Sequence, residues 1–186
     1  MKIYIKNMVS ERCKIVVKSE IELLGFHCKI VELGEAQITE NLSQLQLNRL
    51  NEALKETGLE LIDDKKSIIT EKIKNTIVEL IHYSDEQLKI NFSDYLSEKL
   101  NYNYTYLANI FSEVQGTTIE HFIISHKIEK VKELLVYAGL TLTEISQRLK
   151  YSSVAHLSNQ FKKITGLTPS NFRKLEHKKL IPLDNV

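Results

Sequence analysis

TLTEISQRLKYSSVAHLSNQFKKITGLTPSNFR, residues 141–173, carries the clearest structural pattern in the chain. The pattern predicts two short helices joined by a tight turn, then a loop and the start of a third helix. In the second of these helices Leu157, Phe161 and Ile164 recur at helical spacing, so we expect this face to be buried against neighbouring helices.

The opposite face of the same helix is short-sided or polar. It carries Val154, Ala155, Ser158, Asn159 and Lys162. Periodicity alone would favour an ordinary packing helix with a solvated face, which is a common arrangement. A helix with small and polar side chains on its outer face also fits the major groove of a nucleic acid duplex, where such side chains reach base edges.

The charge distribution favours the second interpretation. Between Thr141 and Lys179 there are eight lysines and arginines and two glutamates. The whole chain has a formal charge of only +1, so the remainder is net acidic. A local basic excess in a nearly neutral protein indicates a polyanionic partner.

Two segments resemble one family. YSSVAHLSNQFKKITGLTPSNFR resembles the C-terminal signature of the AraC/XylS family of bacterial transcription regulators, and YLANIFSEVQGTTIEHFIISHKIEKVKELL, residues 106–135, resembles the first half of the same domain. The resemblance covers about residues 92–175. It implies two helix-turn-helix units joined by a long central helix, with two recognition helices entering successive major-groove segments on one face of double-stranded DNA.

The resemblance also implies which residues contact DNA. In the first recognition helix Leu107, Phe111 and Val114 are expected to be buried, and Asn109 is expected to read adenine through its amide. The base-facing residues of the two helices would be Thr105, Ala108, Asn109, Val154, Ala155, Ser158 and Asn159. The expected phosphate contacts are Lys150, Ser152, Lys162, Lys163 and Arg173.

The sequence departs from the family pattern at two positions in the second unit. Ser146 takes the place of a usual small alanine, and Lys150 takes the place of a usual turn glycine. The turn must therefore adopt another backbone or hold lysine at positive φ, which costs about 1 kcal/mol.

The N-terminal segment, residues 1–64, changes pattern several times. Strands are expected at 2–8, 27–33, 36–39 and 59–62, and helices before Gly25 and at 42–56. The resulting order is βαββαβ, the split arrangement of a ferredoxin-like sandwich. The predicted fold class is therefore α+β, with this sandwich preceding an all-α domain.

This segment resembles heavy-metal-associated domains, whose first loop carries M-x-C-x-x-C. Here the run is Met8-Val9-Ser10-Glu11-Arg12-Cys13, so serine replaces the first cysteine. A soft metal prefers two thiolates, so no metal site and no cofactor is predicted, and Cys13 remains a weak metal candidate. An alternative is a redox-sensitive Cys13, favoured by a helix N-terminus and Arg12; an inert thiol explains it more simply.

Between the two halves the sequence predicts a helix with one apolar stripe. We expect the N-terminal sheet to cover the stripe, and a dimer contact is the alternative. The stripe consists of Ile68, Ile69, Ile73, Ile77, Leu80 and Ile81. The predicted organisation is a regulatory ferredoxin-like domain (1–64), a linker helix (65–86), an AraC-type DNA-binding domain (87–176) and a flexible tail (177–186).

The remaining sequence features limit the possible location, activity and partners of the protein. The N-terminus has neither a signal peptide nor a membrane-span pattern, and two cysteines suit a reducing interior, so a cytoplasmic protein is expected. No phosphate-binding glycine loop or catalytic constellation is present in the sequence, so no enzyme is predicted. RNA polymerase and a second copy of the chain are further candidate partners. The alternatives are a metal- or redox-responsive regulator, or a protein-binding adaptor with weakened DNA affinity.

Overall fold

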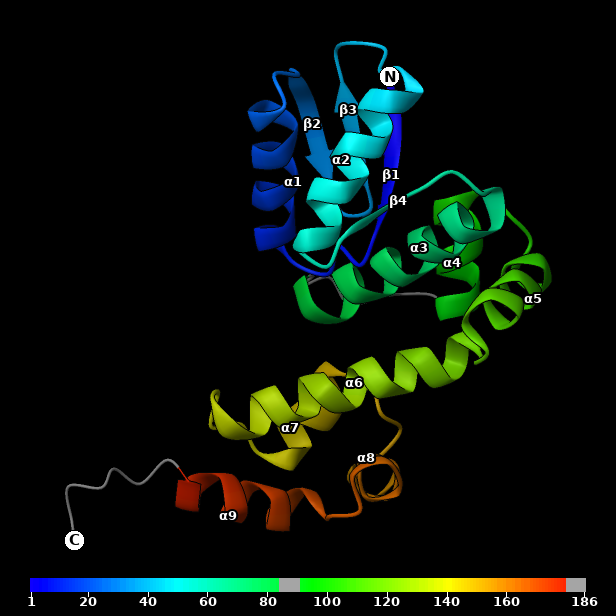
Figure 1. The fold of residues 1–186 in the computed structure, drawn as a ribbon. Coiled ribbons are helices and arrows are strands. Elements are labelled where there is room, and N and C mark those ends of the chain that lie inside the picture. The colour runs from blue at the N-terminus through cyan, green and yellow to red at the C-terminus, as the bar shows by residue number, and fades with distance from the viewer. Residues whose placement is uncertain (84–90, 180–186) are drawn as a thin grey trace, which may run out of the picture. The chain divides into compact units, whose positions relative to one another are not determined.

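The computed structural model describes residues 1–83 and 91–179, with side chains through Leu175 (Figure 1). In chain order the elements are β1 (Lys2–Lys6), α1 (Glu11–Leu23), β2 (Cys28–Glu32), β3 (Glu35–Ile38), α2 (Gln44–Glu56), β4 (Glu60–Ile62), α3 (Lys65–Val78), a π-helical turn (Glu79–Tyr83), α4 (Phe92–Leu100), α5 (Tyr104–Gln115), α6 (Ile119–Val136), α7 (Leu142–Arg148), α8 (Val154–Thr165) and α9 (Pro169–Lys179).

The chain forms two compact units. The first contains Met1–Glu79 and Leu88–Thr118, and the second contains Leu80–Gln87 and Ile119–Val186, each apart from the residues that the structure does not describe. The first unit therefore includes α4 and α5 together with the N-terminal sheet. The predicted boundary between the linker helix (65–86) and the DNA-binding domain (87–176) lies outside the described residues. Helix α9 continues to Lys179, past the predicted start of the tail at residue 177.

The N-terminal sheet has the strand order β2-β3-β1-β4, and every neighbouring pair is antiparallel. Ile3 pairs with Ala36 and Ile5 pairs with Leu61. Helices α1 and α2 lie together against one face of the sheet (Figure 1). This is the predicted βαββαβ sandwich, and it confirms the α+β fold class.

Alternation along β1 separates the two faces of this sheet. Ile3 and Ile5 are buried in the core with Val17 and Ile21 of α1. Because successive side chains point to opposite faces, Tyr4 and its lysine neighbours lie on the face away from α1 and α2. The glycine between β2 and β3, Gly34, has φ +84°, and an added Cβ would collide with the side chain of Asn75.

Helix α3 is more than a linker. Its Ile69, Ile73 and Ile77 are buried, and the helix packs most extensively against α5, with further contacts to α4 and β1. The expectation that the N-terminal sheet covers the stripe is therefore only partly right. Helix α5 is the main partner, because α3 and the first helix-turn-helix segment fold into the same compact unit.

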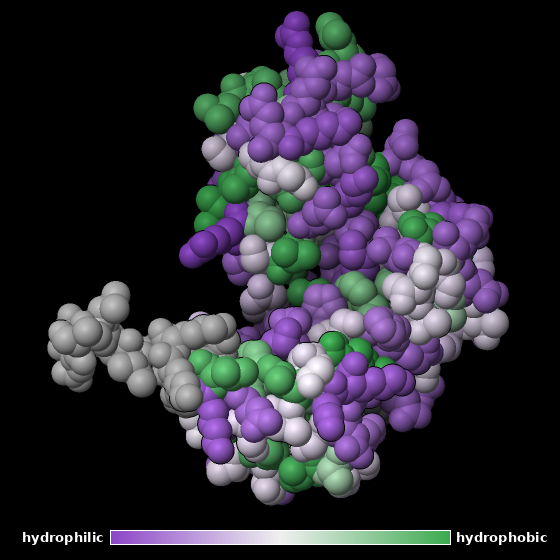
Figure 2. Space-filling model, turned by 60° about the horizontal axis from the view of Figure 1, so that its bottom comes forward, coloured by the Kyte–Doolittle hydropathy of each residue, from purple (hydrophilic) through white to green (hydrophobic). Residues whose placement is uncertain are grey.

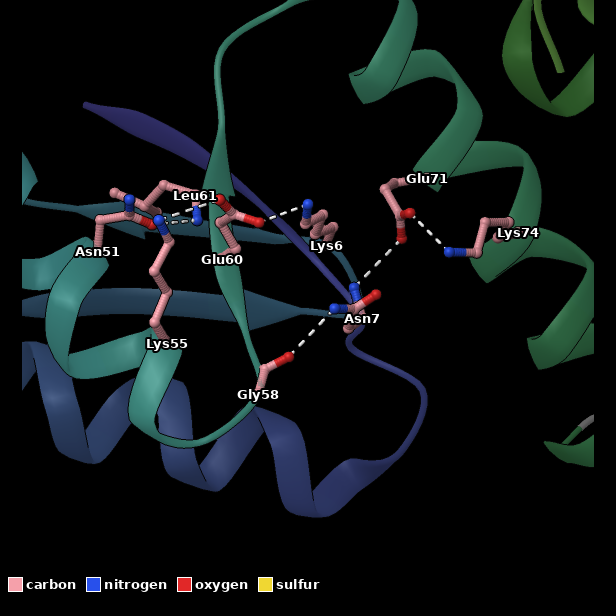
Figure 3. Close-up of polar contacts among 9 residues, drawn as sticks. All are labelled: Lys6, Asn7, Asn51, Lys55, Gly58, Glu60, Leu61, Glu71 and Lys74. Carbon is pink, nitrogen blue, oxygen red and sulfur yellow. Dashed lines mark hydrogen bonds and ion pairs between the residues drawn. The ribbon is translucent and has the colours of Figure 1, made fainter. Parts of the chain in front are cut away.

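A polar contact ties α3 to the end of β1 (Figure 3). The backbone N–H of Asn7 donates to Glu71 Oε2 at 3.4 Å, and Lys74 Nζ donates to Glu71 Oε1 at 2.7 Å. The side-chain nitrogen of Asn7, Nδ2, donates a second hydrogen bond, to the Gly58 carbonyl at 3.1 Å. The buried carboxylate of Glu71 thus has both a backbone donor and a cation as partners, which offsets the cost of burying it.

The second unit is built from α6, α7, α8 and α9. Its core contains Ile128, Val131 and Leu135 of α6, Ile145 of α7, and Leu157 and Phe161 of α8.

Among the described residues, the exposed large hydrophobic side chains include Ile15, Leu23 and Ile30. Figure 2 shows one face of the molecule, on which hydrophobic residues form separate patches among hydrophilic ones.

Candidate nucleic-acid interface

The first helix-turn-helix segment consists of α4, a three-residue turn and α5. Asn101 enters the turn at φ +57°, a left-handed conformation that asparagine tolerates better than most residues. Asn103 then caps α5, because its side-chain oxygen accepts the backbone N–H of Thr105 at 2.8 Å. The helix ends at Gly116, which has φ +67°. The local sequence therefore fixes both ends of α5.

The buried face of α5 differs at one position from the prediction. Leu107 and Phe111 are fully buried as expected, and Ile110 is the third buried side chain. Val114, which we expected to be buried, is 38% exposed. Val114 lies in the last turn of α5, and the buried side chains of this helix end with Ile110 and Phe111.

The outer face of α5 presents the predicted base-facing residues. The side chains of Thr105 and Asn109 are exposed, and that of Ala108 is half-buried. Asn109 is therefore accessible to a base edge.

The second helix-turn-helix segment starts with a capping box. The Thr141 side chain accepts the backbone N–H of Glu144, and the carboxylate of Glu144 accepts the Thr141 N–H at 2.7 Å. The hydrogen bond from the Thr141 side chain lowers the pKa of Glu144. This reciprocal cap fixes the start of α7.

The turn between α7 and α8 holds lysine in a left-handed conformation. Lys150 has φ +54°, so the backbone keeps the glycine-like turn and accepts the strain. The N–H of Tyr151 donates to the Ser146 carbonyl at 2.8 Å, and the Ser146 side chain is buried. Serine is small enough to fit beneath this turn.

A lysine from α6 supports the same turn, and we did not predict it from the sequence. Lys127 Nζ donates to the Leu149 carbonyl at 3.0 Å and lies 5.3 Å from the ring centroid of Tyr151. Burial, and secondarily the charge of Lys150, lower the pKa of Lys127. Burial also raises the pKa of Tyr151 to about 12. The turn thus rests on a half-buried cation held by a carbonyl and an aromatic face.

Helix α8 is anchored by two fully buried side chains. Leu157 and Phe161 have no exposed surface, and the ring of Phe161 meets that of Phe172 edge-on at 5.5 Å between centroids. Ser153 caps the helix by accepting the His156 N–H at 3.0 Å. Ile164, predicted to complete the buried face, is 39% exposed, because it lies in the last turn before Gly166.

The outer face of α8 carries the predicted contact residues. Ala155 and Asn159 are exposed, whereas Val154 and Ser158 are half-buried. One neighbour on this face was not predicted from the sequence. It is the exposed His156, whose Nδ1 lies 2.9 Å from Ser152 Oγ. A serine four residues before a histidine is the only sequence signal for that pair.

The predicted phosphate contacts fall into two groups. The accessible group has exposed side chains and consists of Lys150, Ser152, Lys162 and Lys163. Arg173 differs, since its Nη2 donates to the Leu140 carbonyl and its Nε is buried without a hydrogen-bond partner. Arg173 therefore connects α9 to the loop before α7, and its contact with phosphate stays a prediction.

Cys13 has local partners in the first unit. Its Sγ lies 3.4 Å from Ser10 Oγ. Burial opposes ionisation, but the hydrogen bonds from Ser10 and the backbone outweigh it and lower the pKa of Cys13. Both cysteines are unbridged and half-buried. Within residues 1–83 and 91–179, histidine, cysteine and carboxylate side chains form no cluster of three or more able to hold a metal ion.

Comparison with known proteins identifies the helical region. Residues 96–175 match the family model described as a helix-turn-helix domain. The C-terminal domain of AraT, a response regulator from Geobacillus stearothermophilus, aligns with a TM-score of 0.50 and 27% identity, covering 60% of this chain and 88% of that one. Residues 96–175 are therefore a helix-turn-helix domain of AraC type, which confirms the resemblance seen in the sequence.

Two curated relatives are also similar to this chain. YtdP, an uncharacterised HTH-type transcriptional regulator of Bacillus subtilis, is 29% identical over 103 residues, which are 55% of this chain and 13% of that protein. An uncharacterised HTH-type transcriptional regulator of Staphylococcus aureus is 27% identical over 173 residues, covering 79% of this chain and 23% of that protein. The chain thus spans less than a quarter of the length of these relatives. Among the helices that the structure describes, none is long and apolar enough to cross a membrane.

Proposed function

We propose that this chain is a sequence-specific, DNA-binding transcription regulator. The observation that carries the proposal is the outer face of α8. Asn159 and Lys162 are exposed on a helix held rigidly by buried Leu157 and Phe161, inside a helix-turn-helix domain of AraC type. A rigid helix with exposed amide, small and cationic side chains suits the major groove.

The proposed contacts divide into two kinds. Lys150, Ser152, Lys162 and Lys163 hold backbone phosphates, because they are exposed at the turn before α8 and at its C-terminal end. Bases are read by Val154, Ala155, Ser158 and Asn159 of α8, and by Thr105, Ala108 and Asn109 of α5. The two helices would occupy major-groove segments about one helical turn, ~34 Å, apart.

The remaining parts of the proposal concern the other domains and partners. Residues 1–64 act as the regulatory domain and 87–176 as the DNA-binding domain, with α3 between them. The regulator works in the cytoplasm, where it would contact RNA polymerase and associate with a second copy of itself. It performs no catalysis, because its output is DNA occupancy.

Titration of the protein with a pool of random duplexes at two salt concentrations tests this function. Affinity for DNA should fall steeply as the salt concentration rises. For a fourfold increase in salt, every two to three phosphates contacted should weaken binding by about tenfold or more. Binding that is weak and insensitive to salt would instead indicate the protein-binding adaptor.

A further inference from the structure

A cavity in the first unit has no role in the proposed DNA interface. It has a volume of about 480 Å³, within the range of small-molecule sites. Three parts of the unit line it: Tyr4 of β1, the first turns of α3, and the end of α4 with the turn that follows. Residues distant in the sequence therefore meet around one space.

The cavity collects lysines that have no acidic partner. Most described lysines of the first unit form ion pairs, for example Lys66 with Glu113 and Lys74 with Glu71. In the described part of this unit the lysines outside such pairs are Lys29, Lys65, Lys72 and Lys99. The last three all line this cavity, whereas Lys29 does not.

The positive charge of the lining is only partly offset. Asp63 is the acidic residue of the lining, against the three lysines. Lys72 Nζ also lies 5.2 Å from the ring centroid of Tyr4, which holds its ammonium group beside the sheet. Asp63 offsets only part of this charge, so the ammonium groups around the cavity repel one another, and a bound anion reduces that repulsion.

We propose that this cavity binds a small, multiply charged anion that carries phosphate or carboxylate groups. Lys65, Lys72 and Lys99 supply the positive charge, and the volume accommodates a molecule larger than a single phosphate. Tyr102 of the lining stacks on Tyr106 of α5 at 5.4 Å between ring centroids. The anion would therefore lie close to the start of α5; an effect on DNA affinity rests on the proposed function, but binding of the anion does not.

Nuclear magnetic resonance titration of the full chain tests the proposal without DNA. Inorganic pyrophosphate and citrate are the two probes, at ionic strength held constant with sodium chloride. We expect saturable shifts of the backbone amides of Lys72 and residues 99–102 with at least one probe. A response to pyrophosphate alone assigns phosphate groups, and a response to citrate alone assigns carboxylates.

Matched lysine variants localise the binding. Lys72→Gln and Lys99→Gln should each weaken binding about tenfold, as expected for loss of one hydrogen bond between charged groups. Lys29→Gln, which removes an unpaired lysine outside the cavity, should leave it unchanged. The proposal fails if neither probe gives saturable shifts, or if all three variants weaken binding equally. It also fails if Lys72→Gln and Lys99→Gln reduce the affinity for DNA while the wild-type protein binds neither pyrophosphate nor citrate. These lysines would then contact DNA phosphates.

Discussion

Replacement of Phe161 by alanine is expected to lower the free energy of unfolding of the second unit by about 3–5 kcal/mol. The side chain is fully buried and packs edge-on against Phe172, so its removal leaves a cavity between α8 and α9. Because total stabilities are only about 5–15 kcal/mol, this loss is a large fraction of the stability of the unit. DNA binding should fail with it, since α8 would lose its anchor.

Ile164→Ala is the matched control for this prediction. Both residues lie on α8 and both were expected from their spacing to be buried, but Ile164 is 39% exposed. Its loss should cost less than about 1 kcal/mol, because surface substitutions rarely cost more. Urea denaturation can be monitored by amide hydrogen exchange in α6–α9. This measurement distinguishes the unfolding of the second unit from that of the rest of the chain. Equal losses in the two variants would show that the buried face of α8 is assigned wrongly.

Asn159→Ala and Lys162→Ala should affect DNA binding in different ways. A bidentate amide contact to adenine is worth about 1–3 kcal/mol, so Asn159→Ala should weaken binding to a preferred site about 5- to 150-fold. Random DNA should be bound as before. Lys162→Ala should weaken binding to every duplex and reduce the salt slope by about one, because it removes one phosphate contact.

Fluorescence anisotropy with one preferred and one random duplex measures both variants. The two side chains are exposed on the same helix, so each substitution leaves the core of the unit intact. Parallel losses on both duplexes for both variants would contradict the division into base and phosphate contacts.

The sequence predicted the elements whose signals are local. The alternating and helical patterns of residues 1–64 correctly predicted the order of strands and helices in the sandwich. Leu107, Phe111, Leu157 and Phe161 were correctly predicted to be buried, because each lies in the middle turns of its helix. The same periodicity failed for Val114 and Ile164, which lie in the last turns of their helices and are exposed.

Features that depend on distant contacts were not predictable from the sequence. No signal in the sequence indicated the hydrogen bond from Arg173 to the Leu140 carbonyl, 33 residues earlier. Lys127 gave no sign in the sequence that it would bind the Leu149 carbonyl in the turn before α8. Helix α3 showed an apolar stripe without indicating α5 as its partner, and the clustering of Lys65, Lys72 and Lys99 depends on the packing of α3 against α4.

Selection of bound duplexes from a random pool, followed by sequencing, tests most directly whether this chain reads DNA through α5 and α8. We expect enriched duplexes with two short preferred segments whose centres lie about 10 base pairs apart, one for each helix. A selected pool with the same base composition at every position as the starting pool would contradict the account.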